Sequence, residues 1–155
     1  MPDDSTTFLS EAQATLLADV LDSIVPGGDG LPGAGELGVA SHLDGVVSGS
    51  TRLRRVFTEG LAAIEIVSSR LFTRAFSDLS EDQRVQVLKR IESEHAAFFR
   101  ELVRQTYAGY YTRQDVAALL GLEARPPQPL GYILEPFDPS TLENVKGRGK
   151  IYREI

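Results

Sequence analysis

The most recognisable chemical pattern in this sequence is a glutamate and a histidine three positions apart, Glu92 and His95. On one helix this spacing places a carboxylate and an imidazole on the same face, and ferritin-like bundles build di-iron sites from two such pairs and two further glutamates. This sequence has one pair. The other histidine, His42, has no glutamate three positions before it, and Glu65 is the best further carboxylate. We therefore interpret the pair as a surface glutamate and a hydrogen-bonded histidine, and keep a stand-alone metal-binding helical bundle as the alternative.

Other catalytic and cofactor-binding patterns are missing from the sequence. The chain has no cysteine, which excludes thiolate metal sites, cysteine-ligated iron–sulfur clusters and covalent c-type haem attachment. The glycine-rich residues 27–35 lie between two predicted helices instead of following a strand, so they do not predict a phosphate-binding loop. No Gly-x-Ser-x-Gly sequence marks a nucleophile. We expect no catalytic residue, no bound cofactor and no metal in this chain.

Three tyrosines close together, Tyr107, Tyr110 and Tyr111, are the other conspicuous group. Tyr107 and one of the later two fall on the apolar stripe of a predicted helix, which favours packing in the core with hydrogen-bonded hydroxyl groups. Binding surfaces are also rich in tyrosine, because its ring gives a large contact area at little cost in entropy. We predict all three as partner-binding residues.

Apolar residues recur at helical spacing through residues 1–123 and predict an all-α bundle of about five helices. Ser10 and Ser80 are each followed three positions later by glutamine, the pattern of a capping box at a helix start. Gly60 lies inside the longest predicted helix, where it indicates close approach of another helix. The boundary near Ser93–Glu94 is open, and one continuous helix is the alternative there. The predicted helices cover residues 10–25, about 36–47, 53–72, 80–91, 98–111 and a short piece at 115–120.

Residues 124–155 differ from the rest of the chain. Prolines at positions 126, 127 and 129 exclude a regular helix, and the apolar residues that follow have no period. Ordering each residue costs about 1–2 kcal/mol of backbone entropy, while burying a large apolar side chain returns about 1.5–3 kcal/mol. We therefore predict an extended proline-rich C-terminal arm that is ordered only against a surface, either a partner or the chain's own helices. Its predicted partner-binding anchors are Leu130, Tyr132, Phe137 and Tyr152.

The charge of the chain limits the classes of partner that we expect, and signal or apolar segments would bear on its location. The net charge is −6, and every charged side chain before Arg52 is acidic. A protein of this kind is a poor candidate for binding nucleic acid. No signal sequence and no apolar run of the ~20 residues needed to span a membrane is visible. We expect the chain to be cytoplasmic as written, or periplasmic if a partner with a signal exports it.

Four segments, taken in order, resemble the gluconate 2-dehydrogenase subunit 3 family. The resemblance covers nearly the whole chain, and it depends on the order and spacing of these segments more than on any one of them. They are Phe8–Pro26 with the following Pro32-Gly33-Ala34 and Gly38-Val39, then Phe76–Gln83, Gly109–Thr112 and Arg125–Tyr132.

The resemblance implies an accessory subunit. Members of this family accompany a larger flavoprotein of the glucose–methanol–choline type, often together with a cytochrome c subunit. The large subunit holds FAD and oxidises a sugar, polyol or sugar acid, while the small subunit supports its folding, stability or export. Many members carry a twin-arginine signal, which this sequence lacks. The alternatives are the metal-binding bundle and an interaction protein without an enzyme partner.

Overall fold

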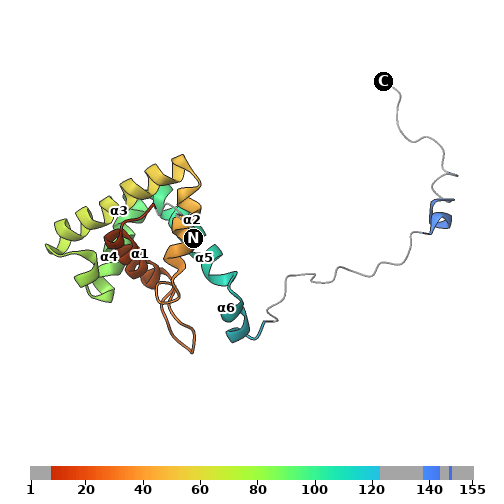
Figure 1. Ribbon diagram of the computed structural model, residues 1–155, viewed down its shortest axis with the longest axis horizontal. Helices are drawn as coiled ribbons and strands as arrows, with labels where there is room; N and C mark the ends of the chain where they lie inside the picture. The colour runs from red at the N-terminus through yellow and green to blue at the C-terminus, as the bar shows by residue number, and fades with distance from the viewer. Residues whose placement is uncertain (1–7, 123–137, 144–146, 148–155) are drawn as a thin grey trace, which may run out of the picture. The chain divides into compact units, whose positions relative to one another are not determined.

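The computed structural model describes residues 8–122, 138–143 and 147 (Figure 1). The chain divides into two units, Met1–Ala124 and Arg125–Ile155. The described residues contain six α-helices, two short 3-10 helices and no strand, so the predicted all-α class is confirmed. The α-helices are α1 (Glu11–Ile24), α2 (Val39–Ser48), α3 (Thr51–Phe72), α4 (Glu81–Glu94), α5 (Ala96–Tyr111) and α6 (Gln114–Leu119).

The starts of α1 and α4 are fixed by the capping boxes that the sequence predicts. The Ser10 hydroxyl accepts a hydrogen bond from the Gln13 backbone N–H, and the Gln13 side chain accepts one from the Ser10 backbone N–H. Ser80 and Gln83 repeat this exchange at α4. Each box satisfies donors that the first helical turn leaves without a partner.

The connection between α1 and α2 is a loop with a tight turn in its first half, and a side chain of α1 holds its second half. Asp29 and Gly30 both have positive φ values, 50° and 81°, in a two-residue turn. The Asp22 carboxylate accepts hydrogen bonds from the backbone N–H groups of Gly35, at 2.6 Å, and Glu36, at 3.2 Å. Residues 34–38, which include the two amides that Asp22 binds, form turns, and α2 begins at Val39 and not near Glu36. The predicted start of this helix was therefore wrong.

Helix α3 crosses α5 at Gly60, which confirms the close approach expected there. A Cβ at this position would lie within 2.5 Å of ring carbons of Phe98 on α5. The Phe98 ring packs edge-on against Phe57, with 5.3 Å between ring centroids. Both phenylalanines are buried. The absence of a side chain at position 60 therefore lets an aromatic ring of α5 lie directly on the backbone of α3.

Helices α4 and α5 are separate helices that meet at His95. This residue has φ −128° and ψ 46°, outside the helical region, and it ends α4 and begins α5. The predicted alternative of one continuous helix was therefore wrong. The break turns α5 back across the bundle, where it contacts α1, α2, α3 and α4.

The core lies among α1–α5, and α6 follows α5 at one end of this unit (Figure 1). None of the helices in the described part of the chain is long and apolar enough to cross a membrane. The largest fully buried side chains include Tyr110, Phe57, Phe76, Leu17, Leu21 and Leu43.

The second unit is described only at residues 138–143 and 147. A short 3-10 helix runs over Pro139–Leu142, and the Asp138 side chain accepts hydrogen bonds from the backbone N–H and the hydroxyl of Ser140. The predicted extended arm falls mostly outside the described residues.

Candidate functional site

Helix α5 has two apolar faces, and the structure buries one of them. The buried face includes small and polar residues that the apolar pattern does not single out: Gln105, Thr106 and Gly109 are buried with Phe98 and Leu102. A Cβ on Gly109 would lie 2.7 Å from His42 Cδ2 and 2.8 Å from Val39 Cγ1, so glycine is what lets α2 approach. The Thr106 hydroxyl donates to the Leu102 carbonyl and is satisfied within the helix.

The opposite face of α5 is exposed or half-buried. We call it the α5 outer face. Its residues recur every three or four positions, as neighbours on one side of a helix do. They are Phe99, Arg100, Val103, Arg104, Tyr107 and Tyr111.

The three predicted tyrosines separate between the two faces. Tyr107 is 47% exposed and Tyr111 is 53% exposed, and their ring centroids are 5.9 Å apart. Tyr107 was expected on the buried stripe and lies on the outer face instead. Tyr110 is 1% exposed and takes the core position. The structure therefore leaves Tyr107 and Tyr111 accessible to a partner, while Tyr110 packs within the bundle and touches Tyr111 edge-on.

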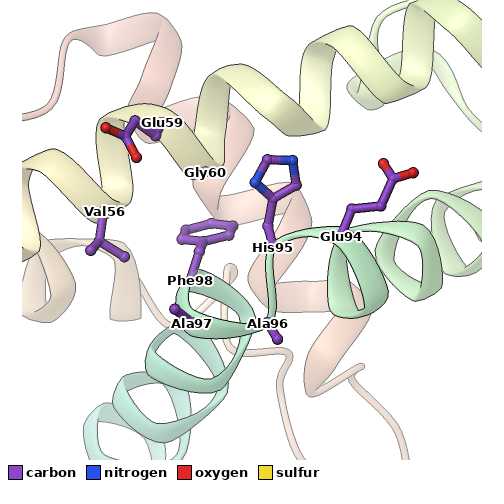
Figure 2. A pocket seen from close by; sticks show the side chains of 8 residues that line it. All are labelled: Val56, Glu59, Gly60, Glu94, His95, Ala96, Ala97 and Phe98. Carbon is purple, nitrogen blue, oxygen red and sulfur yellow. The ribbon is translucent and has the colours of Figure 1, made fainter.

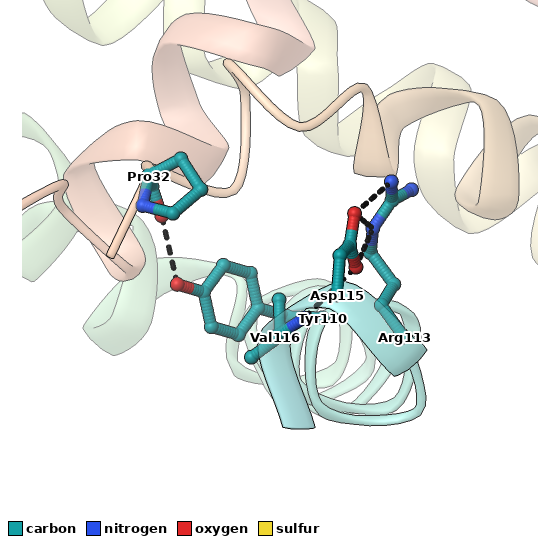
Figure 3. A network of polar contacts seen from close by, with 5 residues as sticks. All are labelled: Pro32, Tyr110, Arg113, Asp115 and Val116. Carbon is teal, nitrogen blue, oxygen red and sulfur yellow. Dashed lines mark hydrogen bonds and ion pairs between the residues drawn. The ribbon is translucent and has the colours of Figure 1, made fainter. Parts of the chain in front are cut away.

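Tyr110 ties α5 to the loop that precedes α2, as Figure 3 shows. Its hydroxyl donates a 2.7 Å hydrogen bond to the Pro32 carbonyl. Burial raises the pKa of the Tyr110 hydroxyl, and the nearby Tyr111 and Asp115 add to the rise. The phenol therefore stays neutral and donating at ordinary pH, which suits a structural position in the core.

The turn after α5 is closed by an ion pair. The Arg113 guanidinium binds the Asp115 carboxylate, with a shortest N–O distance of 2.8 Å (Figure 3). The bond from Arg113 holds the pKa of the Asp115 carboxyl below its usual range. Val116 is buried on α6. Three leucines at the end of this unit are exposed instead: Leu119, Leu120 and Leu122.

A hollow of about 370 Å³ opens where α4 meets α5. It adjoins the α5 outer face, because Phe99, Arg100 and Val103 line it together with Glu92 and Ala96. Phe99 and Val103 are half-buried there, so their side chains form an apolar floor that water still reaches. Arg100 forms no ion pair with any described residue and is exposed.

The remaining charges on α5 are concentrated around Glu101. Its carboxylate accepts hydrogen bonds from Arg104 and Gln105, and lies 3.8 Å from the Arg52 guanidinium of α3. The hydrogen bond from Arg104 is the main reason that the pKa of the Glu101 carboxyl lies below its usual value. The Glu101 side chain is only 13% exposed, whereas both arginines are mostly exposed. The solvent therefore meets guanidinium groups on α5 and no freely exposed carboxylate.

Glu92 and His95 do not share a helix face, because the backbone break at His95 separates them. His95 lines a second hollow, of about 270 Å³, with Glu59, Glu94 and Phe98 (Figure 2). In the described ranges, no group of three or more His, Cys, Asp or Glu side chains could hold a metal ion.

The sequence analysis did not predict some of the residues of this surface, and some of the residues that it did predict lie outside the described part of the chain. It did not select Phe99, Arg100 or Val103 as site residues. The available signal was the spacing of four positions from Phe99 to Val103 and from Val103 to Tyr107, which places these side chains on one face of a helix. It also missed the exposed leucines at the end of α6 and just after it. The predicted anchors of the arm, Leu130, Tyr132, Phe137 and Tyr152, lie outside the described residues.

The described residues define a small all-α protein whose helix α5 presents an outer face with aromatic and apolar side chains. The chain belongs to the gluconate 2-dehydrogenase subunit 3 family, whose model matches residues 11–119. Family membership implies a subunit of a gluconate 2-dehydrogenase-type complex. No significant match was found among curated proteins or among solved structures.

Proposed function

We propose that this chain is a non-catalytic accessory subunit of an FAD-dependent dehydrogenase of the glucose–methanol–choline type. In this proposal the large subunit holds FAD and oxidises a sugar, polyol or sugar acid, with or without a cytochrome c subunit as electron acceptor. The small subunit binds no cofactor. It supports the folding, stability or export of the flavoprotein, in the cytoplasm or after co-export with it.

The observation that carries this proposal is the pair of exposed tyrosines at the end of α5, in a chain of a subunit family. The two rings contact each other and are about half exposed. Such a pair resembles the centre of a protein interface, where tyrosine is enriched. Leu119, Leu120 and Leu122, at the end of α6 and just after it, are further exposed apolar side chains. A surface of this kind is unfavourable in water, and a partner that covers it gains the hydrophobic free energy.

Co-expression with the flavoprotein of a gluconate 2-dehydrogenase-type complex from the same genome tests the proposal. The two chains should co-purify with a fixed stoichiometry, and flavin absorbance should follow the large chain when the two are separated. The flavoprotein expressed alone should be less soluble or lose activity faster on heating. Flavin that stays with the small chain after separation would contradict the non-catalytic assignment. Two chains that never associate would refute the accessory role.

A further inference from the structure

The exposed charges of α5 have the opposite sign to the chain as a whole. The net charge is −6, yet the α5 outer face presents Arg100 and Arg104 among Phe99, Val103 and the tyrosines. Glu101 is the only acidic residue of α5, and its carboxylate is engaged by Arg104, Gln105 and Arg52. A basic and aromatic strip on an acidic protein attracts a surface of negative charge.

The strip also has a place for a side chain of the partner. The hollow at the α4–α5 junction is about 370 Å³ and is floored by Phe99 and Val103. Val103 lies one helical turn before Tyr107, so the hollow and the tyrosines form one continuous surface along α5. Arg100 stands at the hollow with no ion-pair partner among the described residues. Glu92 lines the hollow from α4 and is the one carboxylate there.

From this arrangement we propose that the α5 outer face is the docking surface for the large flavoprotein subunit. The partner places an apolar side chain in the hollow at the α4–α5 junction, and carboxylates beside that side chain pair with Arg100 and Arg104. Tyr107 and Tyr111 pack on the apolar surface next to it. This inference rests on the proposed function and names the chemistry of the partner's contact: an apolar segment flanked by acidic residues.

The chain offers matched variants for a test. Arg100→Glu reverses the charge on the α5 outer face, and Arg74→Glu makes the same change at an exposed turn after α3. Tyr107→Ala removes an exposed ring, so it should leave the fold intact. Glu92→Gln removes the carboxylate that would repel the acidic groups of the partner. Circular dichroism and a melting curve for each variant establish that the helices are retained.

The measurement is the dissociation constant between each purified variant and the flavoprotein subunit, at two salt concentrations. Arg100→Glu should weaken binding about 10-fold or more, and Tyr107→Ala about 30-fold, the size typical of an interface hot spot. Arg74→Glu should stay within about 3-fold of wild type. Glu92→Gln should bind as well as wild type or more tightly. Wild-type binding should weaken as salt rises, and the Arg100→Glu variant should show a smaller salt dependence.

The outcomes separate this inference from the proposed function. If wild type binds the flavoprotein and the Arg100, Tyr107 and Arg74 variants all bind equally well, the docking surface lies elsewhere and the inference is overturned. If wild type does not bind at all, the proposed function fails. If the isolated chain is a dimer that Tyr107→Ala converts to a monomer, the face is occupied by a second copy, which also overturns the inference.

Discussion

The close packing of Phe98 on Gly60 makes a prediction about the same substitution at two glycines. Gly60→Ala and Gly45→Ala each add one methyl group inside a helix. Alanine is favoured over glycine in a helix interior by about 1 kcal/mol. Gly45 is exposed on α2, and outside the neighbouring backbone of its own helix no atom lies within 4 Å of a Cβ built there. Gly45→Ala should therefore raise the free energy of unfolding by about 0.5–1 kcal/mol.

At Gly60 the steric cost of the added methyl group opposes the gain in helix propensity. The added Cβ would lie within 2.5 Å of ring carbons of Phe98, well inside the ~3.5 Å at which carbon atoms begin to attract. The ring cannot move freely, because it is 3% exposed and lies edge-on against the fully buried Phe57. Overpacking of this kind costs about 1–3 kcal/mol. With the upper value and the gain of about 1 kcal/mol from helix propensity, Gly60→Ala should lower the free energy of unfolding by about 2 kcal/mol.

Thermal and urea unfolding of the full chain, followed by helical circular dichroism, measures both effects. The two variants should differ by about 3 kcal/mol in the free energy of unfolding, which corresponds to roughly 10 °C in Tm for a chain of this size. Combining Gly60→Ala with Phe98→Leu should cost less than the sum of the two single changes, since the smaller side chain relieves the clash.

One result would refute this reasoning. If Gly60→Ala stabilises the chain as much as Gly45→Ala does, the ring has moved at no cost. The hollow beside Gly60 and Phe98 is where it would go (Figure 2). The close crossing of α3 and α5 would then not require glycine.

Three further predictions concern polar groups. Tyr110→Phe should lower the free energy of unfolding by about 1–3 kcal/mol, because the Pro32 carbonyl loses its hydrogen bond. Tyr111→Phe on the surface should change the free energy of unfolding by less than about 0.5 kcal/mol. Urea unfolding of the two variants measures both changes. Ser80→Ala removes the α4 cap and should cost about 1 kcal/mol in the same assay. Glu101→Gln should lower Tm at pH 7. Because the folded pKa of Glu101 lies below its usual 4.5, its stabilising effect is complete above pH 4.5 and is lost as the pH falls through the folded pKa, so wild type and variant should then melt together. A Tm difference that persists in acid would contradict the ionic origin.

Local signals were predictable from the sequence, whereas contacts between distant segments mostly were not; the close helix approach at Gly60 is the exception. The capping boxes at Ser10 and Ser80 depend on residues three positions apart, so the sequence contains all that determines them. The start of α2 depends on Asp22, which lies thirteen and fourteen positions before the amides that it binds. Nothing in the local pattern at Glu36 reveals that bond, and the predicted helix began too early.

The orientation of α5 was hidden for a different reason. Apolar residues occur on both of its faces, and the face that the bundle buries includes Gln105, Thr106 and Gly109. A pattern of apolar spacing cannot choose between two apolar faces. The choice is made by Phe98 meeting Gly60 and by Gly109 meeting α2, which are contacts between helices distant in sequence. Tyr110 therefore takes the core position, and Tyr107 stays outside.

The hydrogen bond from Tyr110 to Pro32 joins residues 78 positions apart, and this separation bears on how the chain folds as it is made. Helix α5 packs against α1, α2, α3 and α4, so part of the apolar surface of each of these helices remains uncovered until the chain has been synthesised past residue 111. During that interval α1–α4 can pack on one another, but the surface that α5 covers stays exposed to water. Folding should therefore occur late and in a single cooperative step, and a ribosome-bound chain that ends before α5 should be captured by chaperones, while one that includes α6 should be released.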